Sequence, residues 1–306
     1  MARWDRNQPQ SIPDWFWQAV ETPALEHTVE VDECEVTYRE WEIDDTGSSC
    51  ILFLHGLFAH ARWWDFIAPQ VSACSRVLAM DFTGMGDSDH RYEYTSATYA
   101  HEILAVADAA CLDEATILVG HSLGGRMATK AINAWPDRFG GLVLVDSGVH
   151  DPEEPERNLE DSMPRAGRPK LYPSREVAES RFRLFPAQPV ANHYLLHYIA
   201  RNSVERVEGD AFTWKFDSDL PLALTDIEAS TADYKNLSLP VSIIYGAESE
   251  SYTQATHEYT VSLIPDPLRS VSIADARHHV FLDQPERFVD ELQLSLQWIK
   301  EQTSNN

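Results

Sequence analysis

The stretch GHSLGG (residues 120–125) decides the fold, because it stands between the apolar run ATILV (115–119) and the helix-forming run RMATKAI (126–132). It matches the pattern G-x-S-x-G, with Ser122 at its centre. Where a strand turns sharply into a helix, the middle residue is held in a strained backbone conformation, and glycines are needed where side chains would collide. Ser122 would project at a helix N-terminus, where the helix dipole favours developing negative charge. The context therefore predicts a nucleophilic serine on a nucleophile elbow.

Short apolar runs separated by helix-length segments surround this motif. In chain order the four runs are CILFLHG (50–56), SRVLAMDF (75–82), ATILVGHS (115–122) and GLVLVDSG (141–148). Strands that are apolar on both faces and joined in this way predict a parallel sheet covered by helices on both sides. Ligands of such sheets bind at the carboxyl ends of the strands, so the turns after these runs are where chemistry is expected.

The two ends of the chain complete the predicted sheet. Two alternating runs, HTVEVDE and CEVTYREWEI (27–43), predict an antiparallel pair of strands at one edge. The buried-strand pattern returns in LPVSIIYG (239–246) and PLRSVSIADA (267–276). Residues 149–237 interrupt it with proline, charge and helical segments. Because the sheet pattern resumes afterwards, we interpret this segment as an insertion.

The composition restricts the partners and the compartment. There are 24 Lys and Arg residues against 49 Asp and Glu, a net charge of −25. Such a surface repels phosphate backbones and anionic lipids, so we expect neither nucleic acid nor membrane as a partner. No stretch approaches the roughly 18 apolar residues of a membrane span, and a cytoplasmic protein is the simplest expectation.

Four cysteines lie far apart, with no C-x-x-C spacing and no nearby histidine cluster; they are Cys34, Cys50, Cys74 and Cys111. This spacing favours reduced thiols over a disulfide framework or a metal site. We therefore expect no metal and no cofactor.

Four motifs occur in a fixed order along the chain: HGLFAHARWWDFIAP (55–69), DFTGMGDSD (81–89), GHSLGGRMA (120–128) and HHVFLDQPERF (278–288). Together they resemble the successive signatures of the α/β-hydrolase superfamily, in its cap-bearing, esterase-like serine hydrolase branch. The resemblance implies an α/β-hydrolase fold, with a mostly parallel central sheet flanked by helices. The core would comprise residues 1–148 and 238–306, and residues 149–237 would form a helical cap inserted after the sixth core strand.

The resemblance also selects the catalytic base and the oxyanion hole. In the family the catalytic histidine stands seven residues before the proline of D-x-P-E, which here is His278. One oxyanion N–H comes from the residue after the nucleophile, Leu123. The resemblance assigns the second N–H to Leu57, with Phe58 as the alternative.

The sequence offers more than one candidate for the acid that would orient the histidine. The usual family position, in YGAESES (245–251), holds Ser249, which carries no charge. The other family arrangement puts the acid at the end of the preceding strand, where Asp146 follows a buried run. A carboxylate at such a place needs a partner, and an imidazole would supply one. We predict Asp146, with Glu248 or Glu250 as alternatives.

The resemblance implies hydrolysis of carboxylic esters through an acyl-enzyme. The same triad also serves lactones, thioesters and carbon–carbon bonds, and a slow-turnover ligand receptor on the same fold is an alternative of another class. We expect Trp63, Trp64, Tyr194 and Trp214 to line the substrate pocket, although each could instead pack the core or the cap. The expected partners are a small-molecule acyl substrate and, at most, a second copy of the chain in a homodimer.

Overall fold

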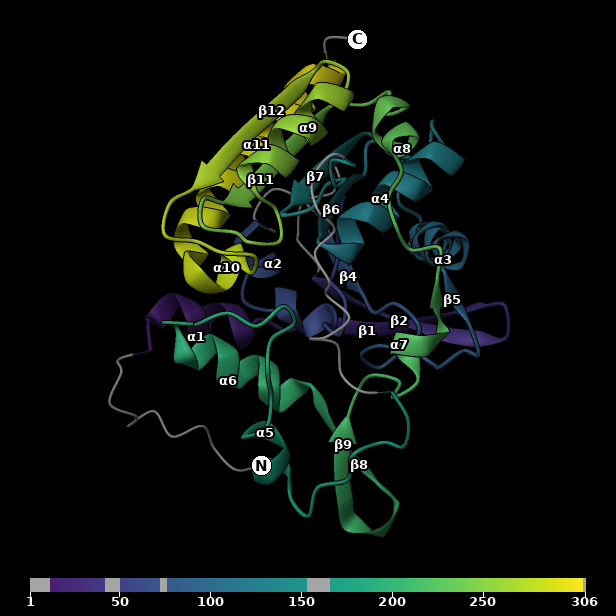
Figure 1. Cartoon of the computed structure of the whole chain (residues 1–306), viewed down its shortest axis with the longest axis vertical. Coiled ribbons are helices and arrows are strands. Elements are labelled where there is room, and N and C mark those ends of the chain that lie inside the picture. The colour runs from purple at the N-terminus through teal and green to yellow at the C-terminus, as the bar shows by residue number, and fades with distance from the viewer. Residues whose placement is uncertain (1–11, 42–49, 72–75, 153–165, 305–306) are drawn as a thin grey trace.

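A computed structural model describes residues 12–41, 50–71, 76–152 and 166–304 (Figure 1). Its main sheet has eight strands in the order β1-β2-β4-β3-β6-β7-β11-β12. The strands are β1 (Leu25–Val31), β2 (Cys34–Trp41), β3 (Ile51–Leu54), β4 (Val77–Met80), β6 (Ile117–His121), β7 (Gly141–Val145), β11 (Val241–Gly246) and β12 (Leu268–Ile273). Neighbours from β4 to β12 pair in parallel, whereas β2 is antiparallel to both β1 and β4. The predicted mostly parallel sheet with an antiparallel edge is therefore confirmed.

The side chains of each central strand contribute to two hydrophobic cores, one on each face of the sheet. Successive side chains of a strand point to opposite faces. On β3, Leu52 and Leu54 join the cluster on one face, and Ile51 and Phe53 join the cluster on the other. This is why the run is apolar without interruption.

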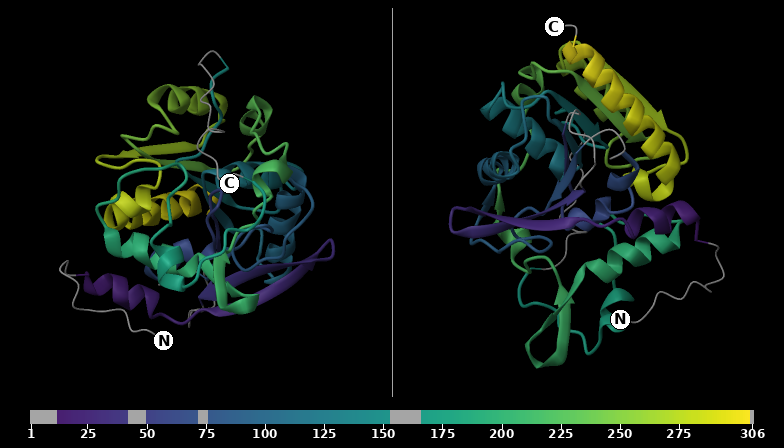
Figure 2. Two further views of the ribbon diagram at one scale, coloured as in Figure 1. Left: turned by 60° about the horizontal axis from the view of Figure 1, so that its bottom comes forward. Right: turned by 180° about the vertical axis from the view of Figure 1, so that it is seen from behind.

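Helices cover both faces of the sheet. One face packs against α3 (Ser96–Ala109), α4 (Leu123–Ala134) and α9 (Gln254–Leu263). The other packs against α2 (Ala68–Val71), α10 (Val280–Asp283) and α11 (Pro285–Ser304). The view from behind in Figure 2 brings α11 to the front of the sheet.

The insertion follows β7, the sixth strand of this sheet in chain order, and forms a lobe at the bottom of Figure 1. The lobe contains α5 (Arg175–Glu179), α6 (His193–Asn202), β8 (Val204–Val207), η4 (Glu208–Asp210), β9 (Ala211–Trp214) and α7 (Leu220–Ala223). The insertion continues through β10 (Leu224–Thr225) to α8 (Thr231–Lys235), which lies away from the lobe and packs against α4 and α9.

A purely helical insertion is thus a wrong expectation. The strands β8 and β9 pair as an antiparallel hairpin, and β10 pairs with β5 (Tyr94–Thr95). The hairpin turns at Gly209, whose φ of 79° suits glycine.

The helix α1 (Asp14–Val20) packs against α6 (Figures 1 and 2). The fully buried ring of Phe16 lies 5.0 Å from that of Tyr194 and 5.7 Å from that of Tyr198. The same ring contacts Phe66 of the core at 6.4 Å. The helix α1 therefore contacts both α6 of the lobe and Phe66 of the core.

Within the described ranges, Cys34, Cys50 and Cys111 are free thiols, and Cys74 lies outside them. In the same part of the chain, no group of three His, Cys, Asp or Glu residues could hold a metal ion. None of the helices described there is long and apolar enough to cross a membrane.

Candidate active site

Ser122 lies between β6 and α4 with φ 52° and ψ −117°, a backbone conformation that non-glycine residues rarely adopt. The turn is tight because a Cβ on Gly120 would lie only 2.5 Å from the Cα of Gly125. The backbone of Ser122 is held from β7: its N–H donates to the carbonyl of Val145 at 3.1 Å, and its carbonyl accepts from Ser147 Oγ at 2.7 Å. The sheet therefore presents this serine at the carboxyl ends of its strands.

A buried carboxylate and imidazole meet at the same edge of the sheet. Asp146 follows β7 with φ 45°, and its Oδ2 lies 2.7 Å from Nδ1 of His278. The same oxygen accepts a hydrogen bond from Ser249 Oγ at 2.7 Å, and Oδ1 accepts one from the N–H of Gly246 at 3.0 Å. Asp146 is 3% exposed and His278 5%. Three donors thus satisfy a carboxylate that burial would otherwise destabilise.

The two alternative acids point elsewhere. Glu248 pairs with Arg277 at 2.9 Å and is about half exposed, and Glu250 is exposed. Between them Ser249, 9% exposed, points inward to Asp146. The sequence does not reveal this contact, although an uncharged residue at the usual acid position is a signal for it.

The turn after β3 approaches the serine closely. A Cβ on Gly56 would lie 3.3 Å from the Cβ of Ser122. The N–H of Phe58 donates to the Met85 sulfur at 3.2 Å, so this alternative oxyanion donor is already engaged. In the part of the chain that the structure describes, the N–H groups of Leu57 and Leu123 have no hydrogen-bond partner. These two groups are free to bind an oxyanion.

His121, the residue before the serine, contacts His278. Its Nε2 lies 3.1 Å from the carbonyl oxygen of His278, and the two rings are 4.7 Å apart. Burial, followed by the neighbouring His278, lowers the pKa of His121 well below its usual range. A neutral ring therefore donates from Nε2 to the backbone carbonyl of His278. The motif marks this residue only as the variable x of G-x-S-x-G.

The family model described as "Alpha/beta hydrolase family" matches residues 51–291. The chain belongs to the alpha/beta hydrolase family. The match runs from β3 into α11 and therefore includes every residue of the site described above.

Curated members of the family are similar along most of the chain. A pimeloyl-[acyl-carrier protein] methyl ester esterase of Aliivibrio fischeri is 25% identical over 84% of this chain and 96% of its own length. An sn-1-specific diacylglycerol lipase of Mus musculus is 25% identical over 80% of each chain. The stronger match to the esterase of Edwardsiella ictaluri, 35% identical, spans 35% of this chain and only 40% of that relative. These similarities support an enzyme of the alpha/beta hydrolase class.

Solved structures share the fold. The E-2-(acetamidomethylene)succinate hydrolase structure has a TM-score of 0.74 at 22% identity, over 90% of this chain and all of that one. A thioesterase domain from the curacin biosynthetic pathway has a TM-score of 0.72 at 21% identity, over 89% and 99%.

Two of the four expected pocket residues of this alpha/beta hydrolase are core residues, which corrects the prediction. Trp64 is fully buried, with its ring 4.7 Å from Phe53 and 5.0 Å from Phe281. Trp63, 3% exposed, packs against Phe281 and His279. Both side chains fill the space between the sheet and α10.

The other two expected pocket residues pack the lobe. Tyr194 contacts Phe16 of α1, and Trp214 packs with Tyr172 and Phe182 inside the lobe. An aromatic side chain of an inserted segment can be buried against the lobe itself as readily as against a substrate.

Three other aromatic rings meet at the turn after β3. Phe58, half-buried, lies 5.3 Å from Phe185 and 5.1 Å from Phe216, both of the lobe. Phe58 directly follows Leu57 in the chain. Phe185 lies in none of the four motifs, and the sequence does not mark it.

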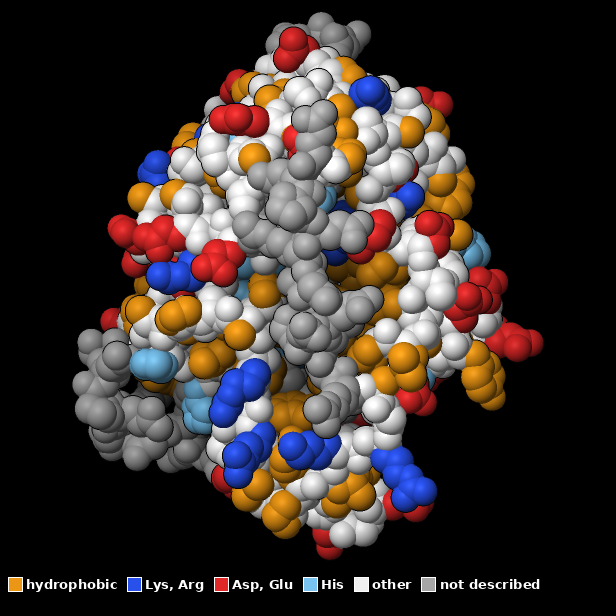
Figure 3. Space-filling view, in the orientation of Figure 1, with side chains coloured by type: hydrophobic (Ala, Val, Ile, Leu, Met, Phe, Trp, Pro, Cys, Tyr) orange, Lys and Arg blue, Asp and Glu red, His pale blue; other side chains and the backbone are white. Residues whose placement is uncertain are grey.

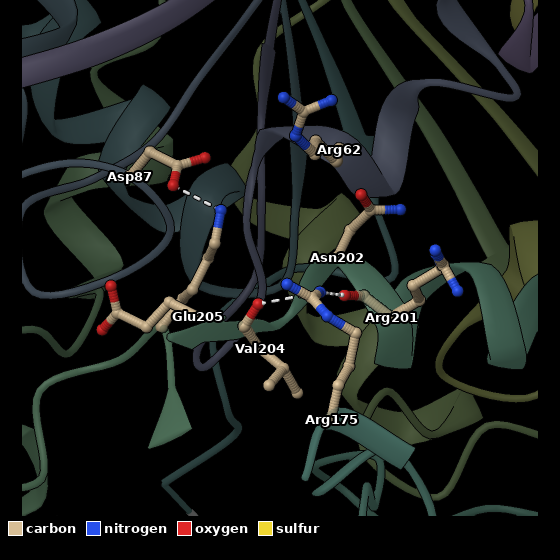
Figure 4. A pocket seen from close by; sticks show the side chains of 8 residues that line it. Arg62, Asp87, Arg175, Arg201, Asn202, Val204 and Glu205 are labelled. Carbon is tan, nitrogen blue, oxygen red and sulfur yellow. Dashed lines mark hydrogen bonds and ion pairs between the residues drawn. The ribbon is translucent and has the colours of Figure 1, made fainter. Parts of the chain in front are cut away.

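A separate polar pocket of about 400 Å³ lies where the lobe meets the core (Figure 4). Its lining comprises Arg62, Asp87, Arg175, Arg201, Asn202, Val204, Glu205 and Lys215. Lys215 pairs with Asp87, and Arg175 donates to the carbonyls of Arg201 and Val204 at 3.0 and 3.3 Å. Lys and Arg side chains also gather over this lower part of the face drawn in Figure 3. Since the lining includes none of Ser122, Asp146 and His278, these charges hold the lobe and lie outside the candidate site.

Proposed function

We propose that the protein is a carboxylic-ester hydrolase with Ser122 as nucleophile, His278 as general base and Asp146 as the acid that orients it. The observation that carries this proposal is the buried pair of Asp146 Oδ2 and His278 Nδ1, 2.7 Å apart, at the strand ends that also present Ser122. A buried acid that holds an imidazole in one tautomer is the arrangement that activates a serine.

The geometry gives each group a step. His278 donates its Nδ1–H to Asp146, which leaves the lone pair of Nε2 to accept the proton of Ser122. The serine oxygen then attacks the ester carbonyl, and the N–H groups of Leu57 and Leu123 stabilise the resulting oxyanion. The imidazolium returns its proton to the departing alkoxide, which leaves as the alcohol. Water, deprotonated by the same imidazole, then hydrolyses the acyl-enzyme and regenerates the serine.

The relatives support an ester as the substrate, since the named Aliivibrio and mouse enzymes are an ester esterase and a lipase. The rings of Phe58, Phe185 and Phe216 at the turn after β3 favour an apolar acyl or alcohol group. The net charge of −25 disfavours polyanionic substrates.

Active-site labelling with a fluorophosphonate tests the nucleophile. We expect the wild type and a control variant, Ser242→Ala, to be labelled and Ser122→Ala not to be. Ser242 is a fully buried serine whose hydroxyl bonds Ser295, so the control also loses a buried hydroxyl. Equal labelling of Ser122→Ala and the wild type would exclude the proposed site.

Turnover tests the reaction. We expect multiple turnovers on short p-nitrophenyl esters, and slower reaction with the matching thioester and lactone. A labelled protein that turns over no member of this panel would instead favour the slow receptor.

A further inference from the structure

The backbone around His278 is held by three side chains. The N–H of the preceding residue donates to Asp283 Oδ2 at 2.7 Å. The carbonyl of His278 itself lies 3.1 Å from His121 Nε2. The N–H of the following residue donates to Gln188 Oε1 at 2.9 Å. Three backbone groups at and beside His278 therefore bond to side chains of other elements.

Two of these partners belong to the core, but Gln188 belongs to the inserted lobe. Its Oε1 also lies 2.8 Å from Nδ1 of His279, and its Nε2 donates to Asp283 Oδ2 at 3.1 Å. An amide oxygen can only accept hydrogen bonds. Because Oε1 faces Nδ1 of His279, it is Nδ1 that carries the proton. Both the oxygen and the nitrogen of the Gln188 amide therefore bond to residues close to His278 in the chain, His279 and Asp283.

The ring of His279 suits this contact. It is fully buried, and burial, followed by the neighbouring His278 and His121, lowers its pKa well below the usual range. The ring is therefore neutral and offers Nδ1–H as a fixed donor. Without Gln188, the N–H of the same residue would lose its acceptor in a buried place, which is unfavourable, and the ring would keep only its hydrogen bond to the backbone of Phe185.

We propose that Gln188 is a positioning residue through which the inserted lobe holds the catalytic base in place. This rests on the function proposed above, in which His278 must meet Asp146 and Ser122 at once. The lobe anchors the same loop a second time, because Asn192 Nδ2 donates to the carbonyls of Leu282 and Asp283 at 2.8 and 3.1 Å. The lobe is therefore part of the support of the base as well as a cover, and activity depends on its being seated.

The test compares Gln188→Met, which keeps the length of the side chain without its hydrogen bonds, with Gln188→Glu, which keeps the acceptor. Because small misplacements of a reacting group are costly, we expect Gln188→Met to lower kcat about 10- to 100-fold. KM should change by less than about threefold, since the lost contact does not touch the substrate. Gln188→Glu should recover only part of kcat, because it keeps the acceptor but sets a carboxylate oxygen opposite Asp283 Oδ2, where Gln188 has its donor. The rate of fluorophosphonate labelling should follow kcat in both variants.

The matched control is Tyr198→Phe, which removes a lobe-to-core hydrogen bond to Asp65 Oδ2, 2.6 Å long and remote from the base. It should lower the melting temperature and leave kcat within about threefold of the wild type. All rates are measured well below the lowest melting temperature of the set.

The inference is overturned if Gln188→Met loses no more kcat than Tyr198→Phe, or if Gln188→Glu is no more active than Gln188→Met. Should Gln188→Met fail to fold, Gln188→Leu, which also lacks both hydrogen-bonding groups, replaces it, and a loss of kcat no greater than that of Tyr198→Phe overturns the inference. Ser122→Ala separates the two proposals, because residual labelling of that variant would reject the proposed function whatever the Gln188 variants do.

Discussion

Replacing Asp146 with asparagine should remove most of the activity while keeping the size of the side chain. Oδ2 of the carboxylate faces two donors, Nδ1 of His278 and the hydroxyl of Ser249, and Oδ1 faces the N–H of Gly246. An amide has one acceptor atom where the carboxylate has two. In Asp146→Asn, either the donors that face Oδ2 or the donor that faces Oδ1 must therefore face an NH₂ group.

Both orientations of the amide are unfavourable, for different reasons. With the amide nitrogen in place of Oδ1, two donors oppose each other across 3.0 Å at Gly246, which costs about 1–3 kcal/mol of stability. With the nitrogen in place of Oδ2, it donates to Nδ1 of His278, so Nε2 carries the proton and cannot accept one from Ser122. Such a tautomer change lowers kcat by about 10⁴ in serine proteases.

The first orientation keeps the tautomer but loses the charge that stabilises the imidazolium. For unit charges about 4 Å apart, this is about 4 kcal/mol at an effective dielectric constant of 20. That energy corresponds to about 10³ in rate. We therefore expect kcat/KM of Asp146→Asn to fall by about 10³ to 10⁴ whichever way the amide turns.

The assay is kcat/KM on a short p-nitrophenyl ester, with the melting temperature measured alongside. Glu248→Gln and Glu250→Gln are the controls and should remain within about threefold of the wild type, because surface substitutions have small effects. A rate for Asp146→Asn above about a tenth of wild type would refute this reasoning. A large fall in either control would move the acid to that glutamate.

Three further outcomes follow from the same site. Ser249→Ala removes one donor of Asp146 and should lower the free energy of unfolding by about 1.5–3 kcal/mol in urea titrations; an unchanged midpoint would contradict the contact. Burial raises the pKa of Asp81 to about 7, so its contribution to stability is complete below about pH 4 and lost as the pH rises through about 7. The stability of Asp81→Asn, compared with wild type at pH 5 and pH 8, should lack this decrease, and parallel pH profiles would exclude it. Gly56→Ala places a Cβ 2.9 Å from Nδ1 of His121 and 3.3 Å from the Cβ of Ser122. It should lower kcat by roughly tenfold or more, because these neighbouring residues must shift; a wild-type kcat would show that the turn yields freely.

The sheet is predictable from the sequence because its cause is local. In β3 every residue from Ile51 to Leu54 is buried, alternately on the two faces, and an uninterrupted apolar run is what such a strand requires. The strand ends then place Ser122 and Asp146 at one edge of the sheet. Their location follows from the topology alone.

The turn after β11 is not predictable in the same way. Ser249 points inward to Asp146, while its neighbour Glu248 points outward to Arg277. One residue of register reverses the direction of a side chain, and no feature of YGAESES fixes that register. The inward serine is visible only once the turn has been folded.

The aromatic residues of the lobe show a second limit. Tyr194 has the composition of a pocket residue, yet its partner is Phe16 of α1, and Trp214 is covered by the lobe itself. Hydrophobicity shows that a ring will be buried and leaves open which surface buries it. Long-range contacts of this kind carry no sequence periodicity.

The contact between α1 and α6 also bears on how the chain acquires its structure. Phe16 and Tyr194 touch but are 178 positions apart, so the ribosome makes one long before the other. Contacts between such distant residues form slowly, because a large loop must close first. During synthesis the ring of Phe16 therefore lacks its contacts with α6 until α6 has been made. Because β11, β12 and His278 follow α6 in the chain, we expect the site to be complete only after β12 and the loop that carries His278 have been made.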